Sequence, residues 1–342
     1  MAKSVCTQAP LFTKHPCHAR CTFSWCIAWI AFLIASAMPI PALAQKPVPV
    51  RQIAITFDDL PFVNEGLSIT DIQKKTRALL KTLQKHRVKA IGFVNEDKLY
   101  IKQSEVNARI GILEAWLDAG MELGNHNLGH LGLQNTPLAA YEAAVLKGEA
   151  VTRRLLRARG QAPRYYRHPY TQTGSSKEVK AAFETFLKRH GYTVAPVTVE
   201  QDDFVFAAVY QDAQRRGDDA MAKRVQAAYA AHLDRALNTF ETMSQELFKR
   251  QIAQIALFHA NRLNAERMDA LLTRMAQRGY RFVSLDEALR DAAYASPDGY
   301  IGKFGPSWLR RWADGLGKKL SVRGQPDPEL WIMRRYQALQ HR

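Results

Sequence analysis

The sequence predicts an α/β fold in which parallel strands alternate with helices. After residue 50, apolar runs typical of buried strands alternate with runs of helical periodicity along most of the chain. Repeated strand–helix units of this kind give a parallel sheet with helices on its outside. The strand-like runs number about seven, which favours a closed or nearly closed barrel over an open sheet.

The elements follow from apolar runs, periodicity and turn residues. Strands are expected at residues 53–57, 90–94, 121–124, 164–167, 192–199, 252–258 and 280–283. Helices are expected at residues 70–85, 106–117, 136–160, 177–189 and 264–279, with a further helix start at residue 284. Thr70 and Ser284 have capping-box spacing to a later Gln or Glu, Asn264 is expected as a cap, and Pro137 is expected at a first helical position.

Two segments depart from this alternation. Residues 211–250 read as one long helix or a pair of helices, with apolar residues from Val225 to Leu247 on one face. We expect a barrel at residues 45–294 that includes this segment as a helical insertion over residues 205–250, with a lid over the site as the alternative. Residues 295–342 are rich in Pro, Gly, Trp and Arg, and we expect them to pack on the barrel as a C-terminal extension.

Residues 1–44 have the layout of a secretory signal peptide. They carry Lys3, Lys14 and Arg20, no acidic residue, an apolar run at 25–35 and the pattern Ala42-Leu43-Ala44. We expect cleavage near Ala44 and export to the periplasm or the medium. The alternative is an uncleaved membrane anchor, although the apolar run is shorter than the roughly 18–20 residues of a spanning helix. All four cysteines lie here, so a cleaved chain would use no thiol chemistry (Cys6, Cys17, Cys21 and Cys26).

The chain is basic, with a formal net charge of +16, three units of which come from the predicted signal peptide. Nucleic acid is one partner that such a charge attracts. An exported protein rarely meets nucleic acid, so we expect none. A loose association with an anionic envelope surface, or a charge that serves only solubility, fits better, and the oligomeric state is left open.

Charged and imidazole side chains stand where the predicted strands end. In parallel barrels the catalytic groups lie at the carboxyl ends of the strands. The agreement of several separate segments therefore predicts one site, and the residues concerned are Asp58, Asp59, His126, Arg167, Asp203 and His259.

The spacing of His126 and His130 suggests a metal site. On a helical turn, residues four apart share a face, so both imidazoles could reach one ion. Asp59 would be a third ligand, and three ligands with a position left for water are typical of a catalytic metal site. Asp58 would then take a proton from the water, with Arg167 holding it ionised. The alternative for Asp58 is a cap on the following turn.

Five ordered segments of the sequence resemble the motifs of the polysaccharide deacetylases, the NodB-homology domains of carbohydrate esterase family four. The resemblance covers roughly residues 50–290. The segments are Thr56-Phe57-Asp58-Asp59, His126-x-x-x-His130, Arg167-x-Pro169-Tyr170, Asp203-Phe204 and Leu257-Phe258-His259.

The resemblance implies a distorted (β/α)7 barrel and a role for each matching residue. It implies a divalent metal, usually zinc, on Asp59, His126 and His130. It makes Asp58 the general base, oriented by Arg167. The remaining implied roles are the main-chain N–H of Tyr170 on the oxyanion, His259 as general acid and Asp203 as the residue that tunes His259.

The implied activity is hydrolysis of N-acetyl groups on the amino sugars of a glycan or oligosaccharide. An O-acetyl esterase would use the same residues, and a barrel that binds glycan without catalysis is the alternative outside the enzymes. A two-carboxylate glycosidase would leave the histidine pair without a role. The sequence departs from the family pattern at Phe204, where a Trp is usual, at Asp202, which competes with Asp203, and at His168, which precedes Pro169.

Overall fold

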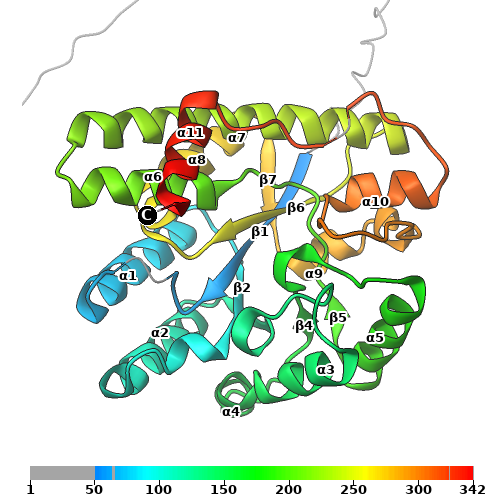
Figure 1. Cartoon of the computed structure of the whole chain (residues 1–342), viewed down its shortest axis with the longest axis horizontal. Helices are drawn as coiled ribbons and strands as arrows, with labels where there is room; N and C mark the ends of the chain where they lie inside the picture. The colour runs from blue at the N-terminus through cyan, green and yellow to red at the C-terminus, as the bar shows by residue number, and fades with distance from the viewer. Residues whose placement is uncertain (1–50, 64–65, 323, 342) are drawn as a thin grey trace, which may run out of the picture. The chain divides into compact units, whose positions relative to one another are not determined.

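The computed structural model describes residues 51–63, 66–322 and 324–341. The predicted signal peptide and its cysteines lie outside these residues. The strands are β1 (Arg51–Leu60), β2 (Ile91–Val94), β3 (Glu122–Asn125), β4 (Tyr165–Tyr166), β5 (Thr193–Val194), β6 (Gln254–His259) and β7 (Tyr280–Val283). All their pairings are parallel, in the order β5-β4-β3-β2-β1-β6, with β7 also on β1 (Figure 1).

The sheet curls into a distorted barrel, which confirms the predicted fold. β6 runs along one edge of β1, while β7 and β2 share the other edge, beside its first and second halves. The ring is completed where Val199, just after β5, pairs with Ala256 of β6 in an isolated parallel bridge. The N–H of Leu257 donates to the carbonyl of Val199 at 3.0 Å. The predicted strand at 192–199 is therefore short, and only its two ends pair.

Helices cover the outside of the barrel. They are α1 (Ile69–Lys85), α2 (Val106–Asp118), α3 (Leu138–Lys147), α4 (Ala150–Arg157), α5 (Lys177–Arg189), α6 (Asp203–Arg215), α7 (Asp219–Phe248), α8 (Arg262–Gln277), α9 (Leu285–Leu289), α10 (Trp308–Gly315) and α11 (Leu330–Gln340). Short 3-10 turns are η1 (Glu96–Leu99), η2 (Gln103–Glu105), η3 (Leu128–His130), η4 (Pro169–Thr171) and η5 (Ala292–Ala295).

Several predicted helix ends were wrong. The cap of α1 is Ser68, whose side chain accepts from the N–H of Asp71, and not Thr70. The cap of α8 is Asn261 rather than Asn264, because the Asn261 side chain accepts from the N–H of Asn264. Ser284 caps α9 as predicted, because its side chain accepts from the N–H of Glu287.

The helix predicted over residues 136–160 is two helices, α3 and α4, and Pro137 is the N-cap of α3 rather than its first residue. The break falls at Gly148. A Cβ at this position would lie 2.7 Å from the backbone nitrogen of Leu128, so only glycine fits there. The break therefore lets α3 and α4 turn beneath the segment that carries the histidine pair.

Residues 211–250 form a pair of helices, one of the two arrangements expected. α6 and α7 are separated at Gly217, which has a positive φ of 66°. The face of α7 from Val225 to Leu247 is buried, as its periodicity predicted. In the C-terminal segment α10 packs against α7, and α11 lies across α6 (Figure 1).

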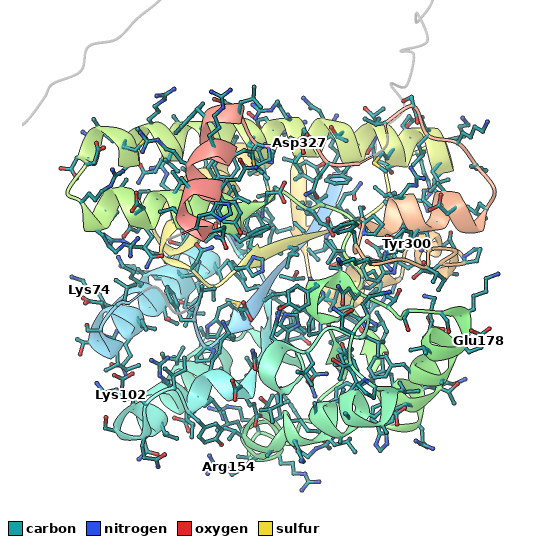
Figure 2. All side chains as sticks on the ribbon, viewed as in Figure 1. Lys74, Lys102, Arg154, Glu178, Tyr300 and Asp327 are labelled. Atoms are coloured by element: carbon teal, nitrogen blue, oxygen red, sulfur yellow. The ribbon has the colours of Figure 1, made fainter. Side chains whose placement is uncertain are left out.

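The described surface is rich in charged groups. Lys74 on α1, Lys102 just before η2 and Arg154 on α4 are exposed and project outward, as does Glu178 on α5 (Figure 2). None of the helices in the described part of the chain combines the length and the apolar composition of a membrane-spanning segment.

Candidate active site

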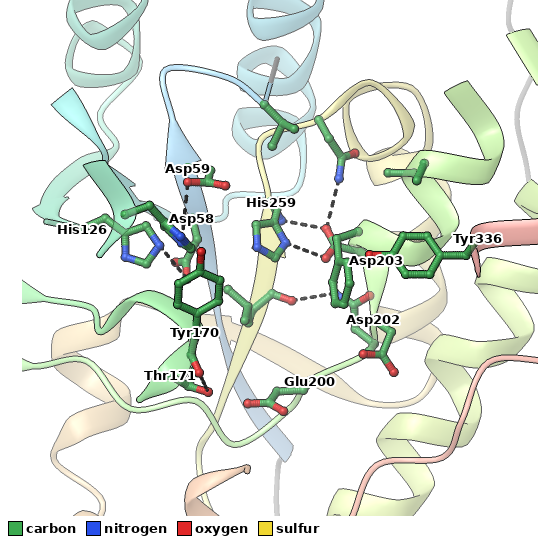
Figure 3. A pocket seen from close by; sticks show the side chains of 18 of the residues that line it. Asp58, Asp59, His126, Tyr170, Thr171, Glu200, Asp202, Asp203, His259 and Tyr336 are labelled. Atoms are coloured by element: carbon green, nitrogen blue, oxygen red, sulfur yellow. Dashed lines mark hydrogen bonds and ion pairs between the residues drawn. The ribbon is translucent and has the colours of Figure 1, made fainter. Parts of the chain in front are cut away.

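The carboxyl ends of β1, β3, β4 and β6 meet at one end of the barrel and surround a cavity of about 550 Å³. Figure 3 shows its side chains converging from separate strands. The sequence-predicted residues that line it are Asp58, Asp59, His126, His130, Tyr170, Asp203 and His259. Arg167, the remaining predicted residue, lies beneath them and touches Asp58.

Asp58 and Asp59 are held apart by the backbone at the end of β1. Asp58 is in register with His259 of β6, so its backbone is still extended sheet. Asp59 has a positive φ of 69°, which turns the chain at this point. The two carboxylates consequently have different neighbours.

The histidine pair does not lie on a helical turn, which was the predicted geometry. His126 directly follows β3, and His130 ends the 3-10 turn η3. Positive φ values at Asn127 (63°), Gly129 (72°) and His130 (51°) fold this segment back on itself. The two imidazole rings approach to 4.9 Å between centroids. A distorted loop, and not a helical turn, therefore brings the two imidazole rings together.

Asp59, His126 and His130 fit a divalent cation. One candidate ligand atom from each lies within 4.8 Å of the other two. Oδ1 of Asp59 is buried and has no hydrogen-bond partner among the described residues. Nδ1 of His126 donates to the carbonyl of Arg167 at 2.9 Å, which leaves Nε2 with a free lone pair for a metal.

The protonation states of this group suit a metal site. Burial lowers the pKa of His126 to about 4. Burial and the neighbouring His126 lower the pKa of His130 to about 4, so both rings are neutral near pH 7. Burial opposes ionisation of Asp59, but Lys98, at 3.3 Å, and His130 lower the pKa of its carboxyl overall. Two neutral imidazoles and one carboxylate are a donor set that suits zinc.

Asp58 is held by Arg167 and belongs to a different environment. Nη1 of Arg167 lies 3.3 Å from Oδ1 of Asp58. The same guanidinium donates to Ala195 O at 2.8 Å and to Thr56 Oγ1 at 3.0 Å, and it is fully buried over the ring of Phe93. Burial raises the pKa of Asp58 to about 6, against the opposing effect of Arg167. A carboxylate with this pKa can accept a proton near neutrality.

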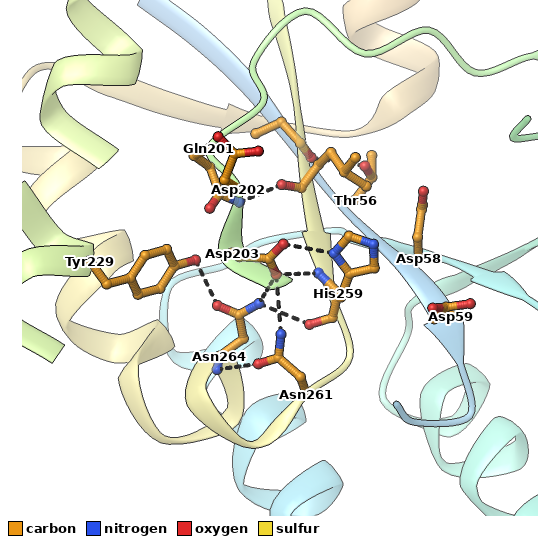
Figure 4. A network of polar contacts seen from close by, with 12 residues as sticks. Thr56, Asp58, Asp59, Gln201, Asp202, Asp203, Tyr229, His259, Asn261 and Asn264 are labelled. Atoms are coloured by element: carbon orange, nitrogen blue, oxygen red, sulfur yellow. Dashed lines mark hydrogen bonds and ion pairs between the residues drawn. The ribbon is translucent and has the colours of Figure 1, made fainter. Parts of the chain in front are cut away.

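His259 lies beside Asp58 on the neighbouring strand β6, and it is held by Asp203. Nδ1 of His259 donates to Oδ1 of Asp203 at 2.7 Å, and its backbone N–H donates to Oδ2 at the same distance (Figure 4). The side-chain amides of Asn261 and Asn264 also donate to Oδ2, at 3.2 and 2.5 Å. Burial opposes the charged ring, but Asp203 raises the pKa of His259 to about 9. The imidazolium is therefore the main form at pH 7, with Nε2 able to donate a proton.

The geometry distinguishes Asp203 from Asp202 as the partner of His259. Asp202 has a positive φ of 48° and accepts a hydrogen bond from Gln325, whereas Asp203 accepts the hydrogen bond from Nδ1 of His259. Tyr170 also has a positive φ, 55°, and its ring meets that of His130 at 4.4 Å. The oxyanion role of the Tyr170 N–H stays a prediction.

His168 does not form part of the cavity floor. It is buried against Tyr166 and Phe183 and lines a separate cavity. Burial lowers its pKa well below the usual value, so the ring is neutral. This departure from the family pattern therefore lies outside the residues that line the cavity of the candidate site.

Several residues of this site were not predicted from the sequence, and four of them matter most here. Glu200, Gln325 and Tyr336 line the cavity, and Asn261 anchors Asp203. Glu200 stands beside the fourth motif and could have been suspected there. Gln325 and Tyr336 are more than 120 residues away from that motif in the chain, and no local signal marks them.

Residues 45–195 match the family model described as polysaccharide deacetylase. No curated protein matches the sequence. A mutant of a CE4 family pseudoenzyme, whose wild type is from Bacillus anthracis, is 17% identical, with 70% of this chain and 68% of that chain covered and a TM-score of 0.47. The family 4 carbohydrate esterase from Streptomyces lividans, in complex with acetate, is 16% identical over 70% and 95% of the chains, with a TM-score of 0.45. The peptidoglycan deacetylase PdaC from Bacillus subtilis is 20% identical over 70% and 92%, with a TM-score of 0.44.

Proposed function

Because residues 45–195 belong to the polysaccharide deacetylase family, we propose that the chain is a metal-dependent hydrolase that removes N-acetyl groups from amino sugars of a glycan or oligosaccharide. Fold alone does not specify activity, so the proposal depends on the site. The observation that carries it is the separation of two adjacent carboxylates. Asp59 groups with two neutral histidines, and Asp58 pairs with Arg167 beside His259 of the neighbouring strand.

The metal that we propose is zinc, held by Asp59, His126 and His130. A divalent cation there supplies Lewis acidity toward the amide carbonyl and makes water more acidic. His126 is kept in the ligating tautomer by the carbonyl of Arg167. Lys98, 3.3 Å from Oδ2 of Asp59, keeps that carboxylate ionised.

Proton transfer is assigned to two side chains of the cavity, Asp58 and His259. Asp58 accepts the proton from the water that attacks the carbonyl carbon, and Arg167 fixes the direction of its carboxylate. His259 donates its Nε2 proton to the amide nitrogen as the C–N bond breaks. Asp203 holds Nδ1 and stabilises the imidazolium beforehand. The N–H of Tyr170 is proposed to donate to the oxyanion. The products are acetate and a free amine.

An acetate-release assay tests this function. The purified chain without residues 1–44 is loaded with zinc and incubated with chitooligosaccharides, peptidoglycan and an O-acetylated glycan in parallel. We expect acetate and free amine in equal amounts from an N-acetylated substrate. Acetate from the O-acetylated glycan alone would support the esterase alternative, whereas binding without acetate from any substrate would support a non-catalytic barrel. Asp58→Asn is the matched inactive control, because it changes one atom of the side chain.

A further inference from the structure

The cavity wall on the side of α6 is built partly by the C-terminal segment. Gln325 precedes α11 and Tyr336 lies on it, and both line the cavity together with Phe204 at the start of α6. Figure 3 shows Tyr336 projecting from α11 toward this wall. All three residues lie outside the part of the chain that matches the family model.

The aromatic side chains of this wall extend from His259, the proposed general acid. The ring of Phe204 lies 6.2 Å from the His259 ring and 6.0 Å from the Tyr336 ring between centroids, both edge to face. Phe204 remains 47% exposed. An aromatic surface of this kind, open to the cavity, suits the apolar C–H face of a pyranose ring.

Polar groups accompany the aromatic rings. Nε2 of Gln325 donates to Oδ1 of Asp202 at 2.8 Å, and both side chains line the cavity. A sugar hydroxyl can both donate and accept, so it could join this pair. Aromatic surface with a few placed polar groups is the usual composition of a small-molecule site.

α11 is held firmly enough to support a wall. Ile332 is completely buried in the core, and the guanidinium of Arg224 on α7 lies 4.1 Å from the centroid of the Trp331 ring. Leu330, at the first position of the helix, is by contrast 75% exposed. The orientation of Tyr336 therefore depends on packing with α6 and α7.

We propose that Phe204, Tyr336 and the Asp202–Gln325 pair form a subsite for a second sugar ring, next to the residue that is deacetylated. The subsite rests on the proposed function for its position relative to the reaction. It makes the C-terminal segment a determinant of chain-length preference, so an oligosaccharide should be a better substrate than a single acetylated group.

The test compares tetra-N-acetylchitotetraose, called chitotetraose below, with p-nitrophenyl acetate, an ester that is too small to reach both the metal group and the wall. The measured quantity is kcat/KM for the tetrasaccharide divided by kcat/KM for the ester. For Tyr336→Ala we expect this ratio to fall about tenfold, because KM for the tetrasaccharide rises. Tyr336→Phe keeps the ring and should retain most of that ratio. Leu330→Ala, an exposed residue of the same helix, is the matched control and should leave both substrates at wild-type values.

Equal losses for both substrates, or no loss for either, would overturn the subsite. Binding of chitotetraose, measured calorimetrically, separates this proposal from the proposed function, because binding needs no turnover. If the wild type binds the tetrasaccharide without releasing acetate, the function fails, and weaker binding by Tyr336→Ala would still support the subsite. If acetate is released and Tyr336→Ala binds as the wild type does, the subsite alone fails.

Discussion

Asp58 and Asp59 are adjacent in β1, yet their carboxylates belong to different clusters. Asp58 lies 3.3 Å from Arg167, and Asp59 lies 3.3 Å from Lys98 and groups with the two histidines. Their electrostatics differ in the same way, because the pKa of Asp58 is raised to about 6 and that of Asp59 is lowered. In the proposed function, this divergence separates proton transfer from metal binding within two residues.

Substituting each aspartate separately tests that division. Asp58→Asn should retain zinc while kcat falls by at least about 100-fold, because the proton acceptor is lost. Asp59→Asn should instead weaken zinc affinity by about 10-fold or more, because a charged ligand is lost. Zinc content after dialysis against a weak chelator, together with acetate release, checks both variants. If both lost zinc to the same extent, the assignment of separate roles would be wrong.

The pH dependence of kcat/KM should be bell-shaped. Asp58 must be ionised to act as base, so activity falls as the pH drops below about 6. His259 must be protonated to act as acid, so activity falls as the pH rises above about 9. Because the charge of Asp203 raises the pKa of His259, Asp203→Asn should move the alkaline limb to lower pH. Kinetics from pH 5 to pH 10 on both proteins measure this shift. An alkaline limb at the same pH in both would show that His259 is not the group that titrates there.

The fold was predictable because strands and helices are specified locally. The apolar runs and the helical spacing gave the seven strand positions and most helices, and the strand ends gave the residues that meet in the cavity. Closure of the barrel was harder to predict from the sequence, because β5 is two residues long and the ring is completed by a single bridge at Val199. No periodicity marks a bridge of one residue.

Spacing along the chain did not reveal how the site residues meet. The meeting of His126 and His130 depends on positive φ values at Asn127 and Gly129, which residue spacing does not reveal. Gln325 and Tyr336 reach the cavity through packing of α11 on α6, a long-range contact. Such contacts are set by tertiary structure, so a pattern within one segment could not indicate them.

Removing Arg167 should destabilise the protein through Asp58. Arg167 is fully buried and its guanidinium satisfies Asp58, Thr56 Oγ1 and Ala195 O. Arg167→Met leaves the buried carboxylate unpaired, and we expect a loss of about 3–5 kcal/mol in the free energy of unfolding. In an Asp58→Asn background the same substitution should cost less, because no charge is left unpaired. Urea unfolding of the four proteins in this cycle measures the coupling. Additive losses would contradict a direct Asp58–Arg167 interaction.

Glu200 should make stability fall as the pH rises. Its carboxyl lines the cavity, Oε1 has no partner among the described residues, and burial raises its pKa from 4.5 to about 8. Between these two values the folded protein holds a proton that the unfolded chain releases, so unfolding becomes easier from pH 4.5 to pH 8. Glu200→Gln removes this penalty.

Its melting temperature should therefore exceed that of the wild type by at least about 2 °C at pH 9 and match it near pH 4. Glu114→Gln, at an exposed position on α2, is the matched control and should show no such pH-dependent gain. An equal difference between Glu200→Gln and the wild type at both pH values would mean that the carboxyl of Glu200 is not held protonated by the fold.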